Sequence, residues 1–210
     1  HAWAFGDGTT SSLTNPSHTY GTQGTYTVTE TVTDGVSGKT SSKAVAVTVS
    51  NGGGGSSQVL LNPGFENGAT SWSASAGVIC TNSGCSGETA HGGTGFAWLN
   101  GYGTTHTDTL SQSATIPAGK ASATLAFWLH IDTAETGSTA YDKLTVQVTS
   151  GSTTTTLATY SNVNAATGYV QHSLNLGAYI GKTITVKFTG TEDSSLQTSF
   201  VLDDITLTVQ

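Results

Sequence analysis

The chain has 210 residues, a formal net charge of −7 at pH 7 and only 9% charged residues, and all six of its basic residues are lysines. This balance argues against nucleic-acid and anionic-membrane partners, because both are recognised by patches of arginine and lysine. No apolar run approaches the length of a membrane-spanning segment, so no membrane insertion is expected. The composition, rich in Thr, Ser and Gly, predicts an all-β, extracellular protein.

The first fifty residues show the period-two alternation of half-buried strands. One run extends over residues 26–32, where Tyr26, Val28, Glu30 and Val32 alternate with threonines, and a second over residues 45–49, where Val45, Val47 and Val49 alternate. Asp7-Gly8 indicates a tight turn ahead of both runs.

Residues 1–50 resemble the PKD domain, an immunoglobulin-like β-sandwich. The motif "FGDGTT…NPSHTY…GTYTVTETVTD" carries the resemblance, although Ala4 stands where that family commonly has Asp. The resemblance implies further strands ahead of Trp3, so we expect an incomplete sandwich with exposed apolar faces. A cleaved upstream peptide, a strand from a neighbouring chain or the following domain folded back would cover these faces.

Residues 51–58, rich in Gly and Ser, are predicted to be a flexible linker. Residues 59–210 then form a separate domain. Alternation and turn signals predict strands at 95–99, 107–114, 123–131, 143–149, 155–160, 169–176, 183–189 and 199–209. Leu125, Phe127, Leu129 and Ile131 mark one core face. So many short strands without helical periodicity favour a two-sheet β-jelly roll.

The only cysteines, Cys80 and Cys85, are separated by four residues that include a glycine. This spacing allows a disulfide, and the alternative is two free thiols. In a chain of extracellular composition the disulfide is favoured. A loop this short would fix one loop tip without holding the domain together.

The last strand contains two adjacent carboxylates, Asp203 and Asp204. Strict alternation places Asp203 on the apolar face of Ile205 and Leu207, where a carboxylate needs a partner or a metal. Glu66 is the natural candidate.

Two motifs, "NPGFENG" and "FVLDDITL", resemble the jelly rolls of carbohydrate-binding modules. This resemblance implies a structural Ca²⁺ bound by Glu66 and Asp203, with Asp204 as the second choice. Main-chain carbonyls near Asn62, Gly64 and the turn at residues 91–94 would complete the shell.

Other polar and aromatic residues are candidates for ligand binding. Trp128, His130 and Asp132 share the face opposite the predicted core of their strand, while Tyr102 lies on a Gly-rich loop before His106. The alternative is an ordinary hydrogen-bonded polar face of a sandwich. Trp72 and Trp98 are interpreted as core residues.

Most of residues 59–210, including "FWLHIDTAETGSTAYDKLTVQV", resemble the C-terminal accessory domain of secreted bacterial peptidases, among them the sedolisin-like enzymes. The resemblance implies a noncatalytic region that contacts a polysaccharide or protein polymer for a secreted hydrolase. Two alternatives remain. One is a structural subunit that self-associates through its incomplete PKD part, and the other is a hydrolase that uses the His/Asp motifs His106-Thr107-Asp108 and His130-Ile131-Asp132.

Overall fold

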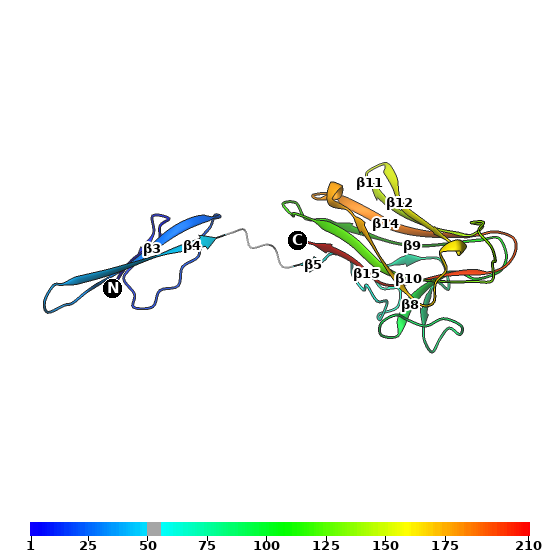
Figure 1. The fold of residues 1–210 in the computed structure, drawn as a ribbon, viewed down its shortest axis with the longest axis horizontal. Coiled ribbons are helices and arrows are strands. Elements are labelled where there is room, and N and C mark those ends of the chain that lie inside the picture. Colours follow the sequence, from blue (N-terminus) through cyan, green and yellow to red (C-terminus); the bar gives the residue numbers. More distant parts are fainter. Residues whose placement is uncertain (50–55) are drawn as a thin grey trace. The chain divides into compact units, whose positions relative to one another are not determined.

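The computed structural model describes residues 1–49 and 56–210, which belong to two compact units divided at Gly55 and Ser56 (Figure 1). Both units are built of antiparallel strands, so the predicted all-β fold class is confirmed. Most of the predicted linker, residues 51–55, lies outside the described residues. Its predicted end at residue 58 was wrong, because β5 (Ser57–Gln58) already pairs with the last strand of the second unit.

The N-terminal unit is one four-stranded sheet with the strand order β2-β1-β3-β4. Its strands are β1 (Ala2–Ala4), β2 (Thr10–Ser11), β3 (Gly24–Thr33) and β4 (Thr40–Val49). The two alternating runs form β3 and β4, as predicted. The described residues of this unit form no second sheet. The apolar face is consequently open, and Val45 is 52% exposed.

Stacked rings hold the N-terminal unit together. The His18 ring lies between Phe5 and Tyr20, with centroids 4.1 Å and 4.6 Å away, and Tyr20 stacks in turn on Tyr26 at 4.1 Å. The Tyr20 hydroxyl donates to the carbonyl oxygen of Phe5 at 2.8 Å, and His18 lies 2.7 Å from a carboxylate oxygen of Asp7. These contacts explain why the motif combines a tight turn with three spaced aromatic positions.

The C-terminal unit is a sandwich of two sheets, here called the β10 sheet and the β14 sheet. The β10 sheet has the order β13-β10-β15-β8-β7, and the β14 sheet has the order β12-β11-β14-β9-β6. The strands are β6 (Ser73–Ala74), β7 (Ile79–Thr81), β8 (Gly95–Asn100), β9 (His106–Thr115), β10 (Ala123–Thr133), β11 (Lys143–Ser150), β12 (Thr153–Ser161), β13 (Val170–Asn175), β14 (Thr183–Glu192) and β15 (Thr198–Val209). Two short 3-10 helices, η1 (Asn162–Asn164) and η2 (Gly177–Tyr179), flank β13. All the strands predicted for this unit are present.

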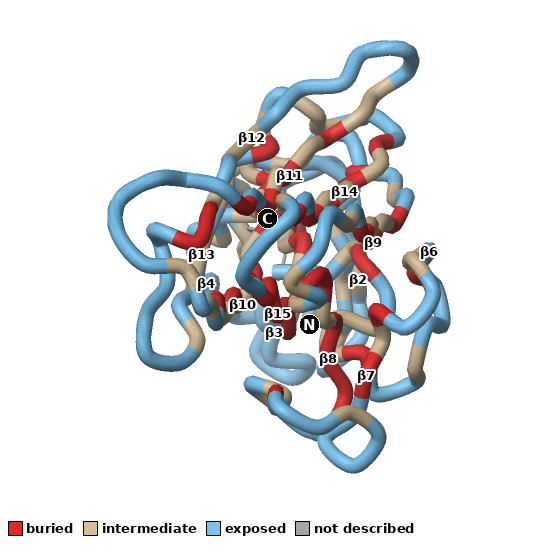
Figure 2. The backbone as a smooth tube through the Cα atoms, turned by 90° about the vertical axis from the view of Figure 1, so that its right-hand side faces the viewer, coloured by how far each residue is buried: buried red, intermediate tan, exposed pale blue. Residues whose placement is uncertain are grey.

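The core lies between the two sheets, and buried residues alternate with less buried ones along most of β10, β11 and β14 (Figure 2). Phe127 of β10 meets Phe188 of β14 edge-on, with ring centroids 5.2 Å apart and an interplanar angle of 82°. Both rings are fully buried. The predicted core face of β10 is therefore confirmed, since Leu125, Phe127, Leu129 and Ile131 are all buried.

A β-bulge in β15 changes which way its side chains point. Ala126 of β10 pairs with Thr206, but Trp128 pairs with Asp203, so β15 carries one extra residue between them. Asp204 occupies this position with a φ of 48°. The prediction that Asp203 shares the face of Ile205 was wrong, because the bulge reverses the alternation and places Asp203 opposite Trp128, on the outer face.

A second, smaller hydrophobic cluster covers that outer face. Phe96, Val201 and Cys80 form its buried part, and Trp98 and Tyr169 pack against it. Cys80 and Cys85 form the predicted disulfide. Trp98 shares the side of Phe96, and Trp72 is buried in the main core, as expected for structural residues.

Reduction of the Cys80–Cys85 disulfide is expected to change the structure only locally. The bond closes a loop of four intervening residues at the edge of the β10 sheet, whereas the two-sheet core contains neither cysteine. Thermal melting with and without reductant should differ by a few degrees at most. Amide chemical shifts should move in residues 79–94 and stay constant in β11 and β14. Global unfolding on reduction would contradict this expectation.

Candidate functional site

Glu66 is positioned by a turn that the side chain of Asn62 organises. The Asn62 amide donates to the carbonyl oxygens of Gly68 and Thr70, and its own oxygen accepts from the Asn67 amide. Asn62 and Phe65 both have positive φ values, 49° and 57°. The backbone of the turn is therefore held in a conformation that few sequences adopt. It carries the Glu66 carboxylate to the start of β8.

The Glu66 carboxylate accepts three hydrogen bonds there. One oxygen accepts from the backbone N–H groups of Gly95 at 2.8 Å and Thr94 at 2.7 Å, and the other accepts from the Thr94 hydroxyl at 2.9 Å. These bonds, from Gly95 first, lower the pKa of Glu66, because they favour the charged form. Glu66 is therefore a fixed carboxylate.

The Asp203 carboxylate binds His91 and Gly92, which come just before the residues that Glu66 binds. Its Oδ2 accepts from the backbone N–H groups of His91 at 2.8 Å and Gly92 at 3.0 Å. Burial raises the pKa of the Asp203 carboxyl to about 6, even though its backbone hydrogen bonds favour the charged form. Asp204, brought round by the bulge, lies 2.8 Å from Nδ1 of His91. Three carboxylates thus converge on residues 91–95.

Glycines leave room for these carboxylates. A Cβ atom on Gly93 would collide with the Glu66 carboxylate, and one on Gly92 would lie 3.0 Å from Oδ2 of Asp204. A Cβ on Gly64 would lie 3.3 Å from Asp204. The backbone of this region, including the Gly64 and Phe65 carbonyls near Gly95, therefore packs directly against oxygen-bearing groups.

The donor set has the chemistry that Ca²⁺ requires, namely carboxylate and carbonyl oxygens in an irregular loop. Among residues 1–49 and 56–210, however, no group of three or more His, Cys, Asp or Glu side chains is arranged to hold a metal ion by itself. Main-chain carbonyls would have to supply several ligands. The residues fit a structural Ca²⁺ on these terms, and the metal stays a prediction.

The predicted polar face of β10 is partly covered. The ring of Trp128 stacks on His91, with centroids 3.9 Å apart and an interplanar angle of 16°. His130 lies 3.0 Å from the carbonyl oxygen of Gly168 and 3.8 Å from the carboxylate of Glu88, whose pKa is raised by burial. Asp132 is exposed. Trp128 thus offers less free ring surface than a ligand platform would need.

Tyr102 and His106 form a separate pair on the β14 sheet side. Their rings lie 4.0 Å apart, and His106 is 3.2 Å from the carboxylate of Asp108. The Tyr102 backbone N–H donates to Glu192 at 3.0 Å. His106 pairs with Glu192 across β9 and β14, whereas His130 lies on the other sheet. The His/Asp motifs therefore do not make one cluster.

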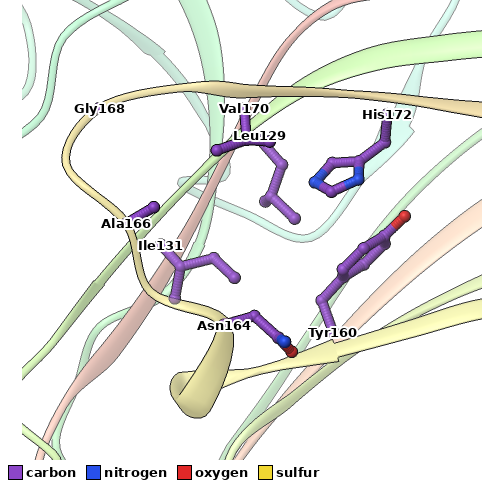
Figure 3. A pocket seen from close by; sticks show the side chains of 8 residues that line it. All are labelled: Leu129, Ile131, Tyr160, Asn164, Ala166, Gly168, Val170 and His172. Atoms are coloured by element: carbon purple, nitrogen blue, oxygen red, sulfur yellow. The ribbon is translucent and has the colours of Figure 1, made fainter.

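A cavity of about 200 Å³, which no sequence pattern indicates, lies at one edge of the sandwich (Figure 3). Leu129 and Ile131 of β10 lie on one side of it, and the rings of Tyr160 and His172 lie on the other. Asn164 and Val170 also line it. The cavity depends on how two edge strands approach each other, which no local pattern reveals.

Comparisons with known proteins found relatives of the N-terminal unit by sequence and of the C-terminal unit by fold. Residues 1–49 match the PKD domain family. Collagenase ColA of Bacillus cereus is 55% identical over 49 residues, which are 23% of this chain and 5% of the collagenase. The chain thus spans only a small part of that relative.

The β-sandwich resembles solved structures. TmCBM61, solved in complex with β-1,4-galactotriose, is 19% identical with a TM-score of 0.54, covering 73% of this chain and 99% of that chain. The K3 cleaved adhesin domain of Lys-gingipain from Porphyromonas gingivalis is 16% identical with a TM-score of 0.49, covering 72% of this chain and 99% of that chain. The fold of the C-terminal unit is therefore similar to the β-sandwich of TmCBM61.

No helix found within residues 1–49 and 56–210 has the length and apolar character needed to cross a membrane.

Proposed function

We propose that this chain is a noncatalytic accessory region of a secreted multidomain hydrolase, in which the β-sandwich holds the enzyme on a polymeric substrate. The fold match to TmCBM61 carries the proposal, since it extends over 99% of that binding module. The PKD match to a collagenase supports a peptidase as the parent enzyme, of the sedolisin-like or another class.

Polysaccharide is the favoured polymer, and a protein polymer is the alternative. The solved neighbour binds a β-1,4-linked galactose trimer, which supports a carbohydrate ligand for this fold. The disulfide supports an extracellular location, because such bonds persist in oxidising compartments. The low content of basic residues supports neither nucleic acid nor an anionic membrane as partner.

A structural Ca²⁺ belongs to this proposal. Glu66 and Asp203 would hold it, with Asp204 close by and carbonyl oxygens of the Gly64 turn completing the shell. The ion would offset the repulsion between the carboxylates that gather around residues 91–95.

A second function is favoured by the open face of the N-terminal sheet. Trp3, Val28 and Val47 line a hollow there, and Val45 is exposed. A strand or face of a neighbouring chain would remove this apolar surface from water, giving a self-associating structural subunit. Light scattering after size exclusion separates the two functions: a concentration-independent monomer contradicts self-association.

Retention on insoluble polymers tests the main proposal. The whole chain should be depleted from solution by at least one of galactan, xylan, cellulose and chitin, and it should release no reducing sugar. Collagen and elastin fibres serve as the protein arm, and bovine serum albumin as the control for nonspecific adsorption. Retention on no polymer of either kind would contradict the proposed function, and retention on protein fibres alone would shift the ligand class.

A further inference from the structure

We propose that the edge cavity is a subsite for a single neutral sugar ring, such as a glycan terminus or side branch. This assignment rests on the proposed carbohydrate-binding function and names a place for it that lies away from the Trp128 face and from the Tyr102 loop.

The cavity lies where the sandwich opens. β13 is the edge strand of the β10 sheet, and β12 is the edge strand of the β14 sheet. The connection from β12 through η1 to β13 crosses between the sheets and contributes Asn164, Ala166 and Gly168 to the wall. The core residues Leu129 and Ile131 of β10, which are 1% and 5% exposed, form the floor, so a ligand would enter from the edge and lie beside Val170 and the rings of Tyr160 and His172 (Figure 3).

Three polar side chains, those of Tyr160, His172 and the exposed Asn164, line this space. Among the described residues, the Tyr160 hydroxyl, the His172 ring nitrogens and the Asn164 Nδ2 have no hydrogen-bond partner. The Asn164 oxygen is already fixed, because it accepts from the backbone N–H and the hydroxyl of Ser161 at 2.9 Å and 3.2 Å. Burial lowers the pKa of His172 and raises that of Tyr160, so both stay uncharged at neutral pH. Together they offer donors and at least one acceptor.

The rest of the wall is apolar and carries no charged side chain. Val170, together with the Tyr160 and His172 rings that stand 4.3 Å apart at 48°, suits the C–H face of a pyranose. An apolar amino-acid side chain would leave the three polar groups unsatisfied, which disfavours a peptide ligand. An anionic sugar would find no cation here.

The volume sets the size of the ligand. About 200 Å³ is below the roughly 300–1,000 Å³ typical of sites for drug-sized ligands, so the cavity has room for one ring and not for an oligosaccharide. Val170 at the mouth is 40% exposed, and Ala166 and Gly168 are exposed as well. The remainder of a glycan can therefore stay outside while one ring is inserted.

The experiment measures binding of free sugars to the whole chain. Saturation-transfer NMR with galactose, glucose, xylose, mannose and N-acetylglucosamine identifies the ring that binds, and titration gives its affinity. Tyr160→Phe removes only the hydroxyl and should weaken binding about three- to tenfold. His172→Phe keeps a ring and removes both nitrogens, and it should weaken binding at least as much. Val170→Trp should block the mouth and abolish binding.

Ser173→Ala is the matched control, because Ser173 follows His172 on β13 and points to the opposite face. Its affinity should equal that of the unmodified chain. Melting curves identify any variant that fails to fold, and Tyr160→Phe alone then carries the test. Unchanged sugar affinity in folded Tyr160→Phe and Val170→Trp overturns the subsite. Binding of none of the five sugars also overturns it. In both cases retention on polysaccharide would leave the proposed function standing.

Discussion

Removal of divalent cations with EDTA is expected to lower the melting temperature of the β-sandwich by roughly 5–10 °C. An ion that binds only the folded state at about 100 times its Kd contributes about 2.7 kcal/mol. For a unit of this size, 1 kcal/mol shifts the melting temperature by roughly 2–4 °C. The effect should come from an ion held by Glu66 and Asp203, whose carboxylates bind residues 91–95. It should reverse when Ca²⁺ is added back in excess.

Two variants test whether those carboxylates are responsible. Glu66→Gln should melt at the same temperature with and without EDTA, because it lacks one charged ligand. Asp132→Asn removes an exposed carboxylate of β10 and should keep the full response to Ca²⁺. Equal melting of the unmodified chain in EDTA and in Ca²⁺, together with no heat of binding in a calcium titration, would rule out the site.

Glu192→Ala is expected to lower the free energy of unfolding by about 3 kcal/mol or more. The Glu192 side chain is buried, and its two oxygens accept from the backbone N–H groups of Tyr102 at 3.0 Å, Gly103 at 2.8 Å and Thr198 at 3.1 Å. Each buried donor left without a partner costs about 1–3 kcal/mol. Water entering the space beside the exposed Tyr102 loop would satisfy some of these three N–H groups. The loss of unfolding free energy should therefore lie near the lower end of the summed range.

Urea unfolding followed by tryptophan fluorescence measures this effect. Glu192→Gln keeps an oxygen acceptor and should lose less than the alanine variant. Thr191→Ala, at the exposed neighbouring position of β14, should change the free energy by less than about 0.5 kcal/mol. A loss below 1 kcal/mol in Glu192→Ala would mean that the loop at residues 101–105 does not depend on this carboxylate.

The strands and the core of the sandwich could be predicted from sequence because they depend on short-range alternation. Val146 and Val148 in β11 and Ile184 and Val186 in β14 repeat every second residue, and every one of them is buried. The bulge at Asp204 could not be predicted this way. The bulge consists of one inserted residue, and a rule of strict alternation treats that residue as an ordinary strand position.

The candidate site was predictable only in part. The resemblance to carbohydrate-binding modules brought Glu66 and Asp203 together with residues 91–94, and the structure has all three at one place. The stacking of His91 on Trp128 was missed, because it joins a loop and a strand that lie far apart in the chain. The edge cavity was missed for the same reason, since Tyr160 and His172 meet only when the two sheets close.

The bulge in β15 also limits how the sequence can vary. In a regular strand, adjacent residues point to opposite sides, yet Asp203 and Asp204 both reach His91. Deleting Asp204 would remove the bulge and leave Asp203 and Ile205 as neighbours on opposite faces of a regular strand, so that Ile205 and Leu207 would stay in the core and only the carboxylate beside His91 would be lost. Sequence variation at this point is therefore limited by the two carboxylates at His91 and not by the core face of the strand.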